Sequence, residues 1–109
     1  TLEDLDFQNV MVEKLERAKT GLIKKKDFAL RDATYWNDYV SPYDIGPWAI
    51  AYLIHKTGPN VLLDTFYPNL NRLGWVGSFK LSFGMSPAQF QSEFLNFMKL
   101  TTDEQSKIL

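Results

Sequence analysis

The side chains best suited to chemistry gather around the start of one apolar segment, 45–54. The set combines aromatic rings with two carboxylates: Trp36, Asp38, Tyr39, Tyr43, Asp44 and Trp48. A tyrosine hydroxyl beside a helix N-terminus can donate a hydrogen bond to a developing oxyanion, as acyl transfer requires. The simpler interpretation is that the rings pack together and their hydroxyls are hydrogen-bonded, and the residues alone favour it. An enzyme complete within this chain would need a carboxylate pair such as Asp38 and Asp44 at catalytic separation in a cleft.

The segment behind these residues predicts a central helix at about 43–57. It is apolar on almost every side, which is typical of a buried helix, so we expect the other helices to wrap around it. Ser41 and Pro42 have the form of a helix cap followed by proline in the first turn. Pro47 then falls in the second turn, where it removes a backbone hydrogen bond. Either the first turn is distorted around the neighbouring glycine, or Asp44 is the true cap.

The rest of the chain is predicted to add helices on either side of this one. Apolar spacing and capping residues give these elements: an N-terminal helix over 1–20 that ends at Gly21, a helix over 59–67 that Pro68 ends, a helix over 73–83 that Gly84 closes, a helix after the capping box Ser86–Gln89, and a terminal helix that starts at Thr101-Thr-Asp-Glu104 and ends at Leu109. The segment 22–40 follows no clear period, and we expect it to be irregular. The sequence therefore predicts one all-α domain over 1–109, a compact bundle of about five to seven helices.

Two apolar stripes are expected to face the core. The N-terminal helix carries Phe7, Val10, Met11, Leu15 and Ala18, and the helix after the capping box carries Phe90, Phe94, Phe97 and Met98. Spacings of three and four residues place each set on one side of its helix.

Composition excludes several classes of function. The net charge of −1 leaves no basic footprint for nucleic acid. The chain has no cysteine, which removes disulfides, thiolate metal sites and cysteine nucleophiles. Its single histidine, His55, cannot form an HExxH zinc motif, and there is no GxSxG, GxGxxG or Walker motif. No apolar run approaches the roughly 20 residues of a membrane-spanning helix. We therefore expect no metal, no cofactor, no membrane segment and no complete active site in this chain.

The region 41–100 carries a further pattern beyond these elements. Tyr43-x-x-Gly46 opens a helix that continues Ala-Ile-Ala-Tyr-Leu and ends at Thr-Gly58. Phe66, Ser78-Phe79, Phe83-Gly84-Met-Ser86 and phenylalanines at 90, 94 and 97 follow it. Together these residues resemble the C-terminal helical region of gluzincin-type zinc metallopeptidases, the thermolysin- and aminopeptidase-like group. The N-terminal helix is outside the resemblance, and Pro47 departs from the small or apolar residue expected after the glycine.

The resemblance implies part of a site rather than a complete enzyme. In aminopeptidase-type members the tyrosine of Y-x-x-G stabilises the tetrahedral intermediate opposite the zinc, and the matching position is Tyr43. The zinc ligands and the general base lie upstream in an HExxH helix and the helix after it, and this chain has neither. It would be a non-catalytic domain that completes a peptide-binding cleft. The candidate binding residues of such a cleft are those that gather at the same helix start: Trp36, Asp38, Tyr39, Asp44 and Trp48. Its partners would be an upstream catalytic domain of the same protein or a peptide, and a secreted member would act outside the cytoplasm.

A second hypothesis belongs to a different functional class. The chain would be a stand-alone helical module that binds a partner protein or dimerises through exposed aromatic residues such as Phe94, Phe97 or Trp75. An apolar surface patch larger than a few hundred Å² would favour this module. A concave polar-aromatic face at Trp36, Tyr39 and Tyr43 would favour the cleft instead.

Overall fold

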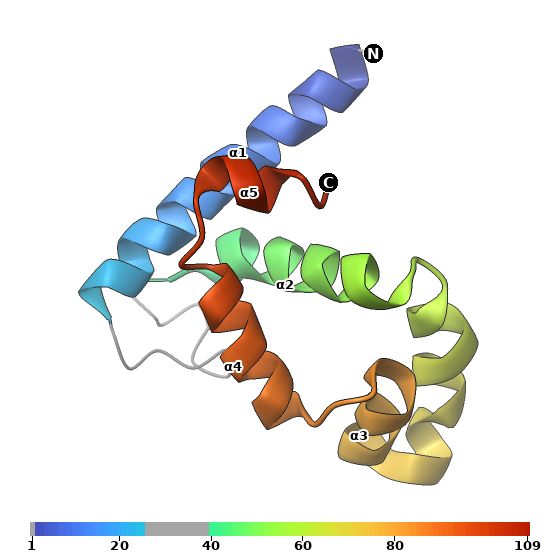
Figure 1. Cartoon of the computed structure of the whole chain (residues 1–109). Coiled ribbons are helices and arrows are strands. Elements are labelled where there is room, and N and C mark those ends of the chain that lie inside the picture. The colour runs from blue at the N-terminus through green and yellow to red at the C-terminus, as the bar shows by residue number, and fades with distance from the viewer. Residues whose placement is uncertain (1, 26–39) are drawn as a thin grey trace.

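The computed structural model describes residues 2–25 and 40–109, and the described part of the chain is all-α, as predicted (Figure 1). Its elements in order are α1 (Leu2–Lys24), α2 (Pro42–Thr57), a π-helical turn η2 (Leu62–Phe66), α3 (Tyr67–Phe83), α4 (Pro87–Phe97) and α5 (Thr102–Ser106). No strand occurs among these residues. Most of the segment expected to be irregular, 22–40, is outside the described residues, and its first three residues belong to α1.

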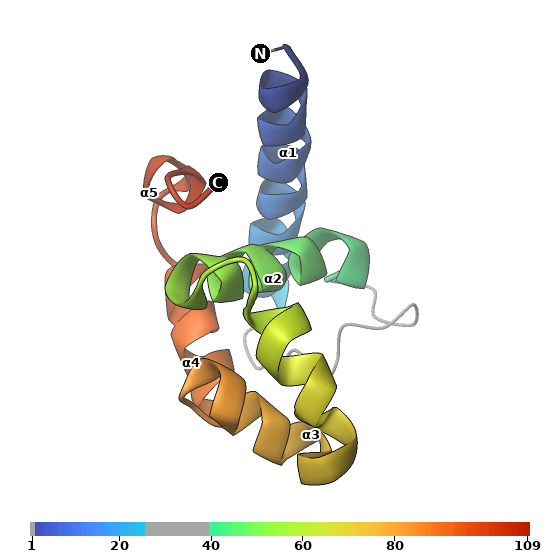
Figure 2. The same cartoon turned by 90° about the vertical axis from the view of Figure 1, so that its right-hand side faces the viewer.

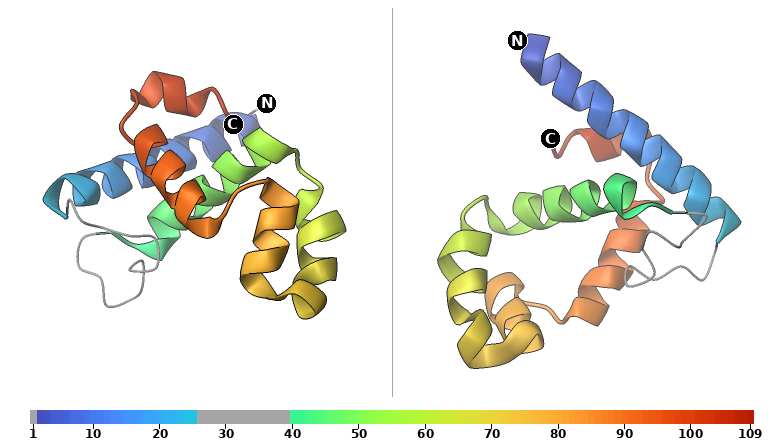
Figure 3. Two further views of the ribbon diagram at one scale, coloured as in Figure 1. Left: turned by 60° about the horizontal axis from the view of Figure 1, so that its bottom comes forward. Right: turned by 180° about the vertical axis from the view of Figure 1, so that it is seen from behind.

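The helix α2 occupies the middle of the molecule, with α1 on one side and α4 on the other (Figures 1 and 2). The helix α1 packs on both α2 and α5, while α3 packs on η2 and α4. The helical run that begins with η2 turns back on itself within α3, at Gly74, so η2 and the last part of α3 form a hairpin at the end far from the N-terminus (Figure 3). The central position predicted for the 43–57 helix is therefore confirmed.

Burial of α2 is one-sided, however, and the expectation of burial all round is wrong. Ile45, Trp48 and Leu53 are buried. Ile50 and Tyr43, in contrast, are 50% and 58% exposed. The reason is the arrangement of the neighbours: the described helices that pack on α2 leave part of its surface uncovered.

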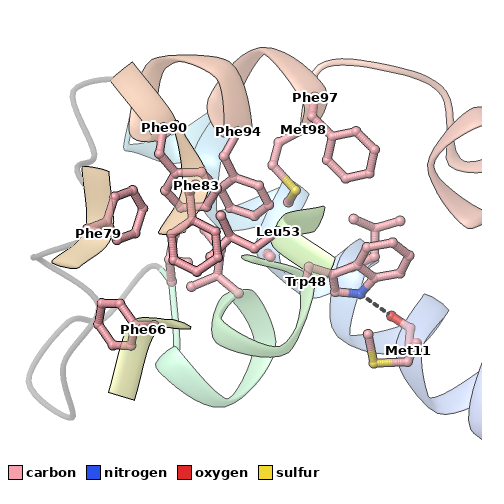
Figure 4. Close-up of a cluster of buried hydrophobic side chains, with 14 residues drawn as sticks. Met11, Trp48, Leu53, Phe66, Phe79, Phe83, Phe90, Phe94, Phe97 and Met98 are labelled. Carbon is pink, nitrogen blue, oxygen red and sulfur yellow. Dashed lines mark hydrogen bonds between the residues drawn. The ribbon is translucent and has the colours of Figure 1, made fainter. Parts of the chain in front are cut away.

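Aromatic rings form the core between α2, α3 and α4 (Figure 4). Phe79 is 4.7 Å from Phe83 and 5.8 Å from Phe90 between ring centroids, which joins α3 to α4. Tyr52 of α2 reaches Phe97 of α4 at 4.9 Å. Ring pairs in such tilted geometries add to the stabilisation from apolar burial. The predicted stripe of α4 is confirmed, since all four of its residues are buried: Phe90, Phe94, Phe97 and Met98.

The predicted N-terminal helix is longer than expected and its stripe is only partly buried. Gly21 does not end α1, because its carbonyl accepts a helical hydrogen bond from the amide of Lys25 at 2.9 Å and its φ is not positive. A glycine stops a helix when it adopts the left-handed conformation, which Gly21 does not. Met11 is buried, as are the next two members of the stripe, but Phe7 and Val10 are 55% and 48% exposed.

The helical boundaries predicted at Pro68 and across 73–83 are also wrong. Pro68 lies inside a continuous helical run, where the amide of Tyr67 donates to the carbonyl of Leu62 in a widened π turn. Such a turn accommodates the proline ring, which would clash in a regular α-helix. The interruption comes instead at Gly74, with φ 73° and ψ 175°. Residue 73 therefore precedes the break, and the regular helix follows it.

Several predicted termini are confirmed. Gly84 closes α3 in the left-handed conformation at φ 70°. Ser86 and Gln89 form the capping box that begins α4. Thr101 caps α5 through its side chain, which accepts from the amide of Glu104 at 3.2 Å.

Buried polar groups fix α5 and η2 in place. Gln105, which is fully buried, donates to the carbonyl of Phe97 at 2.8 Å and accepts from the ammonium of Lys19 at 2.9 Å. Ser78 is also fully buried and donates to the carbonyl of Phe66 at 2.6 Å. A buried polar group is costly unless it is hydrogen-bonded, so these bonds define where α5 and η2 sit.

Candidate functional site

The first turn of α2 presents Tyr43 on a well-defined cap. Ser41 is the N-cap residue, in an extended conformation, and its hydroxyl oxygen accepts from the amide of Tyr43 at 3.2 Å. Pro42 occupies the first helical position, where its missing N–H and fixed φ suit the helix. Of the two alternatives for this terminus, Asp44 as the cap is thus wrong. The Tyr43 side chain is 58% exposed.

Pro47 lies inside α2 and its missing N–H leaves one backbone acceptor without its helical partner. The acceptor is the carbonyl of Tyr43, four residues earlier. Lys14 of α1 supplies the donor, with its Nζ 3.0 Å from that oxygen. A side chain of the neighbouring helix therefore replaces the hydrogen bond that the proline removes.

Asp44 is held by an ion pair with α1. Its Oδ1 accepts from Nε of Arg17 at 3.1 Å and lies 3.0 Å from Nη2. The hydrogen bond to Asp44, together with the charge of that carboxylate, raises the pKa of Arg17. Because Asp44 is only 14% exposed at its side chain, its charge is directed toward α1.

Trp48 anchors the same junction from inside the core. It is fully buried, and its indole N–H donates to the carbonyl of Met11 at 2.7 Å (Figure 4). Met11, Lys14 and Arg17 follow one another at intervals of three, so these contacts come from one side of α1. They fix the backbone at the start of α2 and leave the Tyr43 ring at the surface.

The six residues singled out in the sequence therefore have different fates. Trp36, Asp38 and Tyr39 are outside the described residues, so the proposed pair of Asp38 with Asp44 has only Asp44 within the described part of the chain. Among the others, Tyr43 is exposed, Asp44 is ion-paired and Trp48 has the contacts of a core residue. The binding roles assigned to them stay predictions.

Sequence reasoning did not anticipate Lys14 and Arg17 as parts of this site. Their partners are 29 and 27 residues away along the chain. The only available signal was Pro47, whose missing N–H implies that the carbonyl of Tyr43 needs another donor.

The described part of the chain holds no group of three or more His, Cys, Asp or Glu residues placed to bind a metal ion. Within the same residues, no helix combines the length and apolar character needed to cross a bilayer. His55 lies exposed in the last turn of α2, a position that suits a helix-end cation.

A groove of about 480 Å³ lies between the C-terminal ends of α1 and α4. Apolar and lysine side chains together line this groove: Lys19, Leu22, Ile23, Lys25, Leu95, Met98, Lys99 and Leu100. Lys19 donates hydrogen bonds to the side chain of Gln105 in α5 at 2.9 Å and to the carbonyl of Leu100, just before α5, at 3.0 Å. Tyr43 is not among the lining residues, so this groove is separate from the site at the start of α2.

Comparison of the chain with models of protein families, with curated proteins and with solved structures finds no match.

Proposed function

We propose that this chain is a non-catalytic helical domain that forms one wall of a peptide-binding cleft in a gluzincin-like zinc metallopeptidase. Tyr43 is the residue that faces the cleft. The observation that supports the proposal is the pairing of an exposed tyrosine ring with a backbone held by Ser41 and Lys14. In a secreted peptidase the domain would act outside the cytoplasm.

A fixed backbone matters because stabilisation of an oxyanion depends on preorganised donors. The Tyr43 hydroxyl would donate a hydrogen bond to the oxygen of the tetrahedral intermediate. Asp44 and Trp48 would act as positioning residues, since their side chains bind α1. Arg17 would contribute in the same indirect way, by holding Asp44.

Zinc would be held outside this domain. A zinc site requires several His, Cys or carboxylate ligands that converge, and the described residues offer no such group. The chain's own contribution would be to bind the peptide beside Tyr43 and to place the phenol hydroxyl.

The experiment is to read the natural coding sequence upstream of residue 1. An in-frame HExxH, with a further glutamate some tens of residues later, is the expected result. A start codon directly before residue 1 would contradict the proposal.

A second candidate function, a helical interaction or dimerisation module, is supported by the surface near Gly74. Leu73, Trp75 and Val76 are 37%, 54% and 53% exposed there. Trp75 is stacked on Phe79 at 5.3 Å between ring centroids, so the Phe79 ring fixes the orientation of the exposed indole. Phe94 and Phe97, named from the sequence for the same role, are instead buried: Phe94 is fully buried and Phe97 is 7% exposed.

Sedimentation of the chain at increasing concentration tests this second candidate. A dimer that Trp75→Ser abolishes would support it. A monomer at all concentrations would exclude dimerisation through this surface.

A further inference from the structure

The N-terminal half of α1 projects beyond the rest of the molecule (Figures 1 and 2). Leu5, Phe7 and Val10 on this half are 57%, 55% and 48% exposed. The next members of the same helix are covered: Met11 is 5% exposed and Leu15 is fully buried. The side chains of α1 therefore pass from exposed to buried within one turn, where the helix begins to pack on the other helices.

Phe7 and Val10 continue a face that is buried farther along the helix. Phe7 precedes Met11 by four residues and Val10 by three, and Met11 precedes Leu15 by four. Residues at these spacings share one side of a helix. The apolar face that α2 covers at Met11 and Leu15 therefore extends to Phe7 and Val10, with no described element over it.

The charges on the projecting half are all of one sign. Between residues 4 and 13 the helix contains Asp4, Asp6 and Glu13, and no lysine or arginine. The acids of the first turns also suit the helix N-terminus, but Glu13 is well beyond it. A second copy of this half would bring carboxylates against carboxylates, and an anionic lipid surface would repel it. The acidic charge of this half of α1 therefore favours a partner that carries lysine or arginine side chains.

We propose that the projecting half of α1, residues 2–13, is the docking surface for a basic amphipathic helix of a partner protein. The partner would cover Phe7 and Val10 with its apolar side and place lysine or arginine side chains beside Asp6 and Glu13. Such recognition of one helix by another uses apolar anchors at spacings of three and four residues. Opposite charges at the rim increase the association rate and set specificity. This surface is independent of Tyr43 and of the proposed cleft.

Two synthetic helical peptides with the same leucine pattern test the proposal, one with lysines and one with glutamates at the polar positions. Each is titrated into the isotope-labelled chain while amide chemical shifts are recorded. The lysine peptide is expected to shift signals of residues 2–13 and the glutamate peptide to leave them unchanged. The double variant Phe7→Ser/Val10→Ser is expected to weaken lysine-peptide binding at least tenfold. The matched control Ile50→Ser/Leu81→Ser replaces two other exposed apolar residues, which are 50% and 55% exposed, and is expected to bind as the wild type does.

Three results would overturn the proposal. The first is equal binding of both peptides, and the second is unchanged binding by the Phe7/Val10 variant. The third is self-association of the chain through residues 2–13 in sedimentation, which would make the occupant a second copy. If the double serine variant does not fold, Asp6→Lys/Glu13→Lys replaces it, and the peptide preference must then reverse or weaken at least tenfold for the proposal to stand.

Discussion

Lys14 of α1 donates a hydrogen bond from its ammonium group to the backbone carbonyl of Tyr43 in α2, at 3.0 Å. This carbonyl is the one that Pro47 leaves without a helical donor. The bond explains how a proline in the second turn is tolerated. It also ties the position of Tyr43 to the docking of α1.

A double-mutant cycle between Lys14 and Pro47 tests this relationship. Lys14→Met is expected to lower the free energy of unfolding by about 1 kcal/mol, the usual net worth of a hydrogen bond. In a Pro47→Ala background the restored N–H satisfies the carbonyl, so the same substitution should cost less, with a coupling of about 0.5 kcal/mol or more. Urea unfolding of the four proteins gives the values.

Lys24→Met, in the same helix, is the control for this cycle and should be additive with Pro47→Ala. Equal costs of Lys14→Met in the two backgrounds would show that the ammonium does not replace the missing bond.

Replacing the buried indole tests the anchor between α1 and α2. Trp48→Phe removes the donor to the carbonyl of Met11 and leaves a void in the core. The free energy of unfolding should fall by about 2 kcal/mol or more, from a lost hydrogen bond and a cavity. Trp75→Phe makes the same change at a side chain that is 54% exposed, and should cost well under half as much. Similar costs at both positions would contradict the burial of Trp48.

Replacing Gly74 or Gly46 by alanine should change the free energy of unfolding in opposite directions. At both positions there is space for the added Cβ, so backbone conformation decides the sign. Gly74, at φ 73° and ψ 175°, has a conformation that residues with a Cβ avoid, so Gly74→Ala should destabilise by about 1–3 kcal/mol. Gly46 lies inside α2 without a positive φ, so Gly46→Ala should stabilise by about 0.5–1 kcal/mol. Thermal unfolding measures both. Stabilisation by Gly74→Ala would show that α3 is not interrupted there.

The Lys56–Glu93 pair between α2 and α4 should give a pH-dependent contribution to stability. The hydrogen bond to Glu93, at 2.6 Å, is the main cause that raises the pKa of Lys56, against a smaller opposing effect of burial. A raised folded-state pKa means that the contribution is fully present below the ordinary lysine pKa and is lost as the pH rises through the raised one. Lys56→Met should therefore cost about 0.5 kcal/mol at neutral pH, as expected for an exposed pair. The difference from wild type should disappear in strong alkali, and a difference that persists there would assign the effect to packing.

Local signals in the sequence were sufficient for much of the fold. The capping box at Ser86 and Gln89, the left-handed Gly84 and the cap at Thr101 each act within a few residues, and each was predicted. The stripe of α4 was equally reliable because all of its members meet the core.

The errors arise where a distant contact decides the local structure. Gly21 stays helical, and Pro68 is accommodated by a π turn, neither of which the residue type determines. Phe7 has the spacing of a core residue but is exposed, because α1 is longer than the body that covers it. At the candidate site, the cap at Ser41 was one of two alternatives that the sequence left open, whereas the bond from Lys14 depends on contact between separate helices.

The most direct measurement is peptide hydrolysis by the full natural polypeptide, with wild type compared with Tyr43→Phe. We predict a fall in kcat of about 10²–10³-fold, the usual effect of losing one oxyanion donor, with KM and bound zinc unchanged. Tyr67→Phe, at a tyrosine that is 57% exposed in α3, is the matched control and should keep wild-type kcat. A polypeptide without peptidase activity, or a Tyr43→Phe variant with wild-type kcat, would contradict the role proposed for this domain.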